Sequence, residues 1–197
     1  MKILFVSLGC DKNLVDTEKM LALVQEQGYE ITNEEEEAEV VVVNTCCFIQ
    51  DAKEESIVTI LEYAKKKEEG LLKGIIITGC LAQRYKEEVQ AEIPEVDIIL
   101  GSASYDSILE ALECLKKNEK KNKYDSLEYL PKNLTKRIVT TGTSMAYLKI
   151  AEGCNKRCTY CIIPSIRGNY RSVPMEEVLE EAKQLVQKGI KELVLVA

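Results

Sequence analysis

Eight cysteines and no histidine limit the chemistry that this 197-residue chain could do. Imidazole catalysis and histidine-ligated metals are excluded, so a bound metal would depend mainly on thiolates. Three cysteines fall in the short segment GCNKRCTYC, at Cys154, Cys158 and Cys161. Thiolates at this CxxxCxxC spacing can hold three irons of a cubane cluster and leave the fourth iron open for a substrate. Structural zinc is the alternative, but it takes four ligands and this loop offers three.

Three further cysteines each follow an apolar run. Cys10 ends ILFVSLGC, Cys46 ends VVVVNTC, and Cys80 ends GIIITGC. If these runs are parallel strands, their carboxyl ends meet at one edge of the sheet, where ligands bind in such folds. We therefore predict that Cys10, Cys46 and Cys80 form a second metal site. The alternative is ordinary packing, because small buried cysteines are common in protein cores.

The two remaining cysteines are expected to have no part in metal binding. Cys47 is adjacent to Cys46, and neighbouring residues in an extended chain face opposite ways. Cys114 lies among apolar residues of a predicted helix and is interpreted as core packing.

The elements that position the first three cysteines alternate between strand and helix. Apolar runs predict strands at 2–8, 40–43, 74–78 and 96–100. Amphipathic stretches predict a helix opening at Asp16 and closing at Gly28, a second ending at Gly70, and others at 84–92 and 104–117. The second should bury Ile57, Val58, Ile60, Leu61 and Ala64. This alternation predicts an α/β fold, with a parallel-sheet, Rossmann-like domain over residues 1–117.

The rest of the chain predicts a linker at 118–146 and the start of a second domain at 147–197. A strand at 147–151 precedes the cysteine loop. Pro174 opens a helix that runs from 176 to 188, and a strand follows at 192–197. This order is that of a parallel (β/α) barrel, whose chemistry lies in the loops after its strands. Only two barrel strands are present, so we expect an N-terminal fragment of a longer enzyme.

Charge is unevenly distributed along the chain, whose net charge is −7. Residues 1–113 hold 10 Lys and Arg against 24 Asp and Glu, a net charge of −14, and residues 114–197 carry +7. An acidic unit binds nucleic acid poorly, although acidic helix faces also serve solubility alone. The lysine-rich tract at 118–123 is interpreted as a solvated linker, with a nucleic-acid patch as the alternative.

The N-terminus, MKILFVSLGC, faintly resembles a lipoprotein signal, but its apolar stretch is short for one. No run of the sequence is long and apolar enough to span a membrane. We expect a cytoplasmic protein with reduced thiols and no membrane partner.

The cysteine loop, with Tyr160 before its last cysteine, resembles the radical S-adenosylmethionine (SAM) superfamily. The segment GCNKRCTYCIIPSIRGNYRS, preceded by Cys10, Cys46 and Cys80, more narrowly resembles the methylthiotransferases, over essentially the whole chain. The resemblance implies two 4Fe–4S clusters. Cys154, Cys158 and Cys161 would hold the one whose open iron binds SAM, and Cys10, Cys46 and Cys80 the one that handles the inserted sulfur.

The segment SLGCDKNLVDTE resembles the branch that methylthiolates an aspartate of a small-subunit ribosomal protein, through Lys12, Asn13, Leu14, Val15 and Asp16. Asp11 departs from a usual proline and Val173 from a usual arginine. Neither is a predicted cluster ligand, but any contact that the arginine makes is in doubt.

The resemblance also implies roles and partners. Tyr160 would lie near the adenine of SAM. Arg157 and Arg167 are candidates for the SAM carboxylate or for an anionic substrate, as are Lys156 and Arg171, unless these residues are simply solvated. No residue is assigned a separate catalytic role, because the cofactors carry the chemistry. The implied partners are the ribosomal protein or ribosome and an electron donor such as flavodoxin or ferredoxin.

Two alternatives stay open. One is a tRNA adenosine methylthiotransferase of the same family. The other, of a different class, is a radical SAM fragment whose N-terminal domain is a non-catalytic docking module. In every case we expect the fragment alone to be inactive, because most of the barrel that would enclose SAM is absent.

Overall fold

The structure is a computed structural model that describes residues 1–131 and 135–197. Its first unit is a five-stranded parallel sheet in the order β2-β1-β3-β4-β5. The strands are β1 (Lys2–Ser7), β2 (Glu30–Thr32), β3 (Val40–Thr45), β4 (Gly74–Thr78) and β5 (Ile98–Ile99). The four predicted strands and their parallel arrangement are confirmed, and the short edge strand β2 is an addition that the sequence did not reveal.

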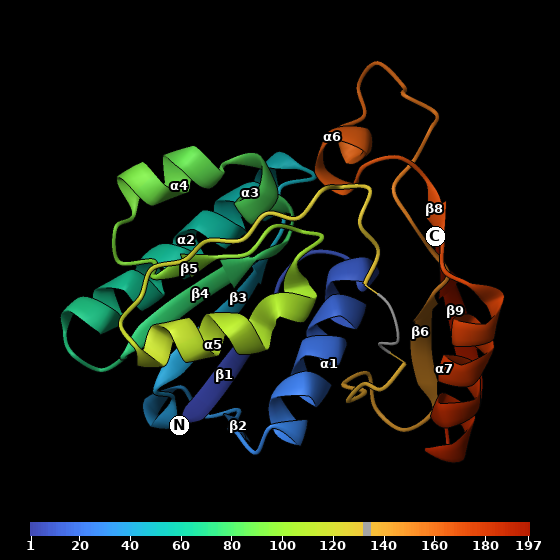
Figure 1. Cartoon of the computed structure of the whole chain (residues 1–197), viewed down its shortest axis with the longest axis horizontal. Coiled ribbons are helices and arrows are strands. Elements are labelled where there is room, and N and C mark those ends of the chain that lie inside the picture. The colour runs from blue at the N-terminus through green and yellow to red at the C-terminus, as the bar shows by residue number, and fades with distance from the viewer. Residues whose placement is uncertain (132–134) are drawn as a thin grey trace.

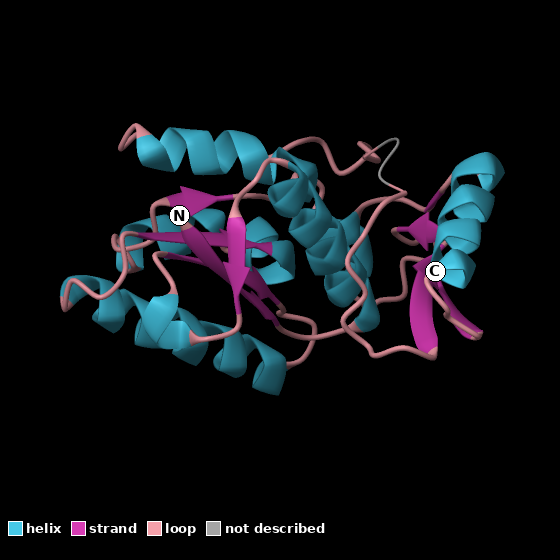
Figure 2. Cartoon of the chain, turned by 90° about the horizontal axis from the view of Figure 1, so that it is seen from below, coloured by secondary structure: helices cyan, strands magenta, loops and turns pink. Residues whose placement is uncertain are grey.

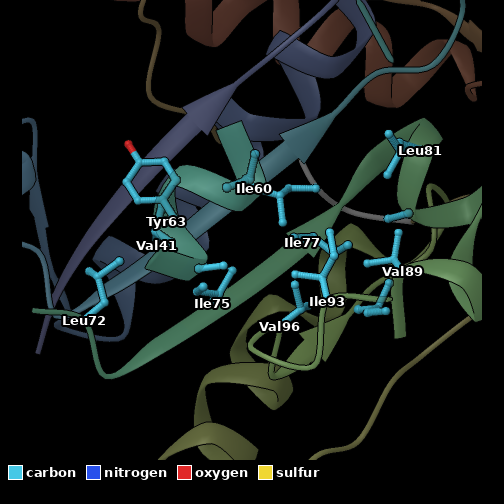
Figure 3. Close-up of a cluster of buried hydrophobic side chains, with 14 of the residues drawn as sticks. Val41, Ile60, Tyr63, Leu72, Ile75, Ile77, Leu81, Val89, Ile93 and Val96 are labelled. Atoms are coloured by element: carbon cyan, nitrogen blue, oxygen red, sulfur yellow. The ribbon is translucent and has the colours of Figure 1, made fainter. Parts of the chain in front are cut away.

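Helices cover both faces of this sheet (Figures 1 and 2). One face packs against α1 (Asp11–Glu26) and α5 (Ile108–Lys116), and the other against α2 (Gln50–Glu68), α3 (Gly79–Arg84) and α4 (Lys86–Glu92). Short 3₁₀ turns lie at η1 (Glu35–Glu37) and η2 (Tyr105–Ser107). The four valines of β3 alternate between the two cores, as the period of a strand requires. Figure 3 shows Val41 of this strand beside Ile60 of α2 and Ile75 and Ile77 of β4.

Several helix predictions need correction. Val58 and Leu61 were expected on the buried side of α2, yet both are about half exposed, and the buried positions are Ser56, Ile60, Tyr63 and Ala64. This stripe follows the i, i+4, i+7 spacing that brings residues to one face of a helix. The helix predicted at 84–92 is α4, which begins two residues later, and the short helix α3 before it was not predicted. The helix predicted at 104–117 begins as η2.

The first helix also starts earlier than predicted. α1 begins at Asp11 and not at Asp16, because Asp16, Thr17 and Glu18 are buried within it and are not its first turn. Asp16, Thr17 and Glu18 resemble the polar residues that start a helix, but they lie inside α1 and make buried contacts.

The second unit carries the cysteine loop. Strand β6 (Met145–Lys149) pairs in parallel with β9 (Glu192–Val196), and α7 (Met175–Gln187) packs against them. Between β6 and α7 lie β7 (Ala151–Glu152), α6 (Ile163–Arg167) and β8 (Arg171–Ser172); β7 and β8 form an unpredicted antiparallel pair. Pro174 precedes α7 as its N-cap instead of standing in its first turn. The predicted β–loop–α–β start of a barrel is confirmed.

The connection between the units runs back over the sheet. Lys123 pairs with Leu100 as one more parallel bridge beside β5. The predicted linker is therefore joined to the first unit at Lys123, whereas Arg137 of the same segment contacts Glu181 of the second unit. Residues 132–134 lie outside the described residues.

Candidate functional site

Cys10, Cys46 and Cys80 meet at the carboxyl edge of the sheet. They follow β1, β3 and β4, and all three line one cavity of about 1200 Å³. The convergence predicted from the strand ends is therefore confirmed. Cys154, from the second unit, lines the same cavity. The protein thus brings cysteines of both predicted sites to one space, although their role as metal ligands stays a prediction.

Two glycines allow the cysteine loops to approach this closely. Gly9 and Gly79 directly precede Cys10 and Cys80, and both have positive φ angles, of 90° and 93°. A Cβ at Gly9 would stand 2.7 Å from the Cys46 sulfur, and one at Gly79 would stand 2.4 Å from the Thr45 carbonyl oxygen. Only glycine fits both the backbone conformation and the space. Gly9 and Gly79 thus pack the segments of Cys10 and Cys80 against the segment of Cys46, as a shared ligand would require.

The surroundings of the three thiols differ. Cys10 is exposed at the N-cap of α1, where the helix dipole favours negative charge. Cys46 and Cys80 are each only 4% exposed. Burial raises the pKa of the Cys80 thiol, and the Arg167 guanidinium beside it acts in the opposite direction. The Ser56 hydroxyl of α2 fixes the Cys46 backbone through hydrogen bonds of 2.9 Å with its N–H and its carbonyl oxygen.

The donor set suits an iron–sulfur cluster. In a cubane each cysteine thiolate binds its own iron, so the ligand sulfurs stand apart across the cluster. The three thiols follow the ends of three strands and line one large cavity, which matches that requirement. In the described ranges, no group of three or more His, Cys, Asp or Glu side chains is arranged to hold one metal ion.

The second cysteine set is open. Cys154 and Cys161 are half-buried, Cys158 is exposed, and residues 155–160 between them are exposed throughout. Two backbone hydrogen bonds shape this loop: the Cys154 N–H donates to the Gly168 carbonyl and the Cys161 N–H to that of Cys158, each at 3.0 Å.

The predicted SAM contacts separate into two groups. Tyr160 is 89% exposed on the loop, and Arg157 is exposed beside it with a positive φ of 48°. Arg167 is buried, lines the cavity and is engaged by protein groups. Lys156 is exposed and Arg171 is half-buried.

Arg167 belongs to a buried ion cluster that joins the two units. Its Nη1 lies 2.9 Å from the Asp16 carboxylate of α1 and 3.3 Å from that of Glu152. Lys149 pairs with the same two acids, with 2.8 Å to Glu152. Burial alone would lower the pKa of Lys149, but Asp16 and Glu152 outweigh it and hold that pKa above its ordinary value. These residues, called the Asp16 cluster below, keep four charges paired at the domain boundary.

A second ion cluster lies further along α1. Lys19 stands 3.1 Å from Glu181 of α7, and Arg137 of the connection lies between Glu181 and Glu18. Neither ion cluster was predicted from the sequence. A charged residue inside an apolar run, such as Lys149 within MAYLKIA, could have indicated a buried ion pair.

The other two cysteines behave as predicted. Cys47 is buried in the core under α2, where burial raises its pKa to about 11. Cys114 is buried between α5 and the opposite face of the sheet. Neither lines the cavity. Among the described residues, no helix is long and apolar enough to cross a membrane.

Comparison with known proteins agrees with this architecture. The chain is 60% identical over its full length to the ribosomal protein uS12 methylthiotransferase RimO of Lachnoclostridium phytofermentans, of which it covers 45%. It is 48% identical over its full length to the protein of the same name from Clostridioides difficile, of which it covers 44%. The chain thus spans less than half the length of these curated relatives.

Two families match successive parts of the chain. Residues 2–101 match the uncharacterized protein family UPF0004, and residues 148–197 match the radical SAM superfamily. The second match implies SAM and iron–sulfur chemistry. Since the first match takes in just over half of the residues, the chain belongs to the UPF0004 family, joined to the start of a radical SAM domain, and the family predicted from its cysteines is confirmed.

Proposed function

We propose that the chain is the first part of a radical SAM methylthiotransferase that adds a methylthio group to an aspartate of ribosomal protein uS12. The observation that carries the proposal is the shared cavity, lined by Cys10, Cys46 and Cys80 on one side and Cys154 on the other. Such a reaction needs a radical source and a sulfur source within reach of one substrate carbon. A cavity lined by the whole first set and by Cys154 of the second supports that proximity, although Cys158 and Cys161 do not line it.

In this proposal the two thiol sets each hold one 4Fe–4S cluster. Cys154, Cys158 and Cys161 would hold the cluster that supplies the electron for cleavage of SAM, and Cys10, Cys46 and Cys80 would hold the cluster that supplies the sulfur. From the exposed loop, Tyr160 would contact the adenosyl part of SAM and Arg157 its carboxylate. Arg167 is the third candidate for that carboxylate, from its place on the cavity wall. The chain's own residues place the sites and limit access of water.

Domain boundaries at 117 and 147, and an electron donor such as flavodoxin or ferredoxin, belong to the same proposal. The acidic first unit, with its net charge of −14 over residues 1–113, suits a basic protein substrate better than an anionic RNA. The names of the relatives point the same way, so the tRNA-modifying alternative is not favoured. The docking-module alternative does not account for two Gly–Cys pairs packed against the loop that carries Cys46.

Iron stoichiometry tests the two-cluster part. The chain is reconstituted anaerobically beside a Cys10/Cys46/Cys80→Ala triple variant, and iron and sulfide are counted. About eight irons falling to about four supports two cubanes. Four irons in both would reduce the first unit to a docking module. Product mass analysis with the full-length enzyme, on a uS12 peptide against a tRNA nucleoside, then separates the two substrates.

A further inference from the structure

One buried amide contacts the segments that carry all three N-terminal cysteines. Asn13 lies in the first turn of α1 with no solvent exposure. Its Nδ2 donates to the Leu8 carbonyl at 2.8 Å and to the Thr45 carbonyl at 3.0 Å. Its Oδ1 accepts from the Cys80 thiol at 3.9 Å. The two carbonyls belong to the segments that lead into Cys10 and Cys46, so a single side chain links the ends of β1, β3 and β4.

The orientation of this amide is fixed from the other unit. The Nη2 of Arg167 on α6 donates to the Asn13 Oδ1, while the Nη1 of Arg167 is held by the Asp16 cluster. An amide flipped by 180° would turn its NH₂ toward a guanidinium and its oxygen toward two carbonyls, so only one orientation is satisfied. The Asn13 backbone carbonyl accepts a further bond from Asn44 at 2.8 Å, which holds the start of α1 against β3.

We propose that Asn13 is the positioning residue of the N-terminal cluster: it holds the three cysteine loops at the spacing the cluster needs, and Arg167 aligns it with the radical SAM domain. The proposal rests on the two-cluster function above. A side chain that crosslinks three loops lowers the conformational freedom that cluster binding would otherwise have to remove. Asn13 does not touch the reacting atoms, so its effect is expected on cluster assembly and spectrum.

The test isolates the N-terminal site. Asn13→Ala is introduced in a Cys154/Cys158/Cys161→Ala background of the whole chain, and iron, sulfide and the electron paramagnetic resonance (EPR) spectrum of the reduced cluster are measured. The parent should hold about four irons. We expect Asn13→Ala to lower the iron content at least about twofold, because the three cysteine segments are no longer linked and the cluster is released more readily. The EPR signal should also broaden. In the reciprocal Cys10/Cys46/Cys80→Ala background the same substitution should change nothing.

Ser104→Ala is the control for general destabilisation. The Ser104 hydroxyl is equally buried and accepts a hydrogen bond from the Asp125 N–H at 2.7 Å, and Ser104 does not line the cavity. Asn13→Asp is the second variant: it keeps the shape and the contact with Arg167 but cannot donate to the Leu8 and Thr45 carbonyls. It should show the same loss, and thermal melting by circular dichroism establishes that each variant is folded.

Parental iron content and EPR spectrum in folded Asn13→Asp would overturn the role of Asn13 while leaving the two-cluster function standing. An equal loss in Ser104→Ala would overturn it too, because general destabilisation would then explain the effect. A parent that binds no iron at the N-terminal site would overturn the two-cluster function itself, and this role with it.

Discussion

The two predicted cysteine sites offer the same donor group, the thiol, but are assembled in different ways. Cys10, Cys46 and Cys80 are far apart in the sequence and are brought together by three buried parallel strands. Cys154, Cys158 and Cys161 are close in the sequence and lie on a loop whose residues 155–160 are all exposed. The first set is brought together by the ends of buried strands. The second is brought together by its spacing on one loop, which two backbone hydrogen bonds shape.

This difference determines where the cost of ordering falls. Fixing a residue costs on the order of 1–2 kcal/mol of backbone entropy. Folding of the sheet already orders the segments of the first set. In the proposed function, the loop of the second set would lose its backbone entropy only when its cluster binds. The preformed site should therefore respond to mutations in its protein frame, and the loop site to the presence of its metal.

The largest effect is expected from the ligands themselves. In the full-length enzyme, Cys80→Ala and Cys158→Ala should each abolish methylthiolation, measured by mass spectrometry of the product. They should differ in one respect: Cys80→Ala leaves the SAM-binding site intact and still forms 5′-deoxyadenosine, whereas Cys158→Ala forms none. Cys114→Ala, in the core beneath α5, should keep activity. Full methylthiolation by Cys80→Ala would contradict a second cluster.

The next largest effect is expected at the domain boundary, where the preformed site is tied to the loop site. Asp16→Asn leaves Lys149 and Arg167 buried with one carboxylate fewer, and breaking a buried ion pair costs about 3–5 kcal/mol. Urea denaturation should show this as a lower free energy of unfolding.

The matched control is Glu110→Gln, since Glu110 also bridges two cations, Lys121 and Lys123, but on the surface. We expect no measurable change there, because exposed pairs contribute little. Equal stability of Asp16→Asn and the parent would show that the Asp16 cluster does not hold the two units together.

A smaller effect is expected from the glycine that lets the Cys80 loop approach. Gly79→Ala combines a strained positive φ with a Cβ 2.4 Å from the Asn44 oxygen, so we expect a loss of about 1–3 kcal/mol and of iron at the N-terminal site. Gly142→Ala separates backbone strain from steric overlap, because Gly142 has a φ of 99° but open space around it. If both variants retained all their iron, close packing of the loops would not matter for the cluster.

The sequence predicted the two cysteine sites but not the contact between the two units. Strand ends placed Cys10, Cys46 and Cys80 together because a parallel sheet leaves little freedom in where its strands finish. The CxxxCxxC spacing predicted the second set without reference to any fold. What could not be predicted was the contact between the two units. Asp16 and Asn13 appeared as helix-start and branch markers, and their partners Lys149 and Arg167 lie more than 130 residues away. Pairing across such a separation follows from the packing of α1 on β6, which no local pattern encodes.

The smallest effect is expected on cleavage by protease, which tests directly whether the two cysteine sites differ in their order without metal. Lys156 and Arg157 are exposed trypsin sites inside the second cysteine loop, whereas Lys12 beside Cys10 is half-buried and bonded to the Ala151 carbonyl at 3.3 Å. Anaerobic loading with iron and sulfide should slow cleavage after Lys156 and Arg157 about tenfold, because binding depopulates the open loop, and should leave cleavage after Lys12 unchanged. Mass spectrometry of timed digests reports each bond separately. Equal protection at both sites would mean that the sheet edge also folds on its cluster, and the contrast between a preformed and a metal-organised site would be lost.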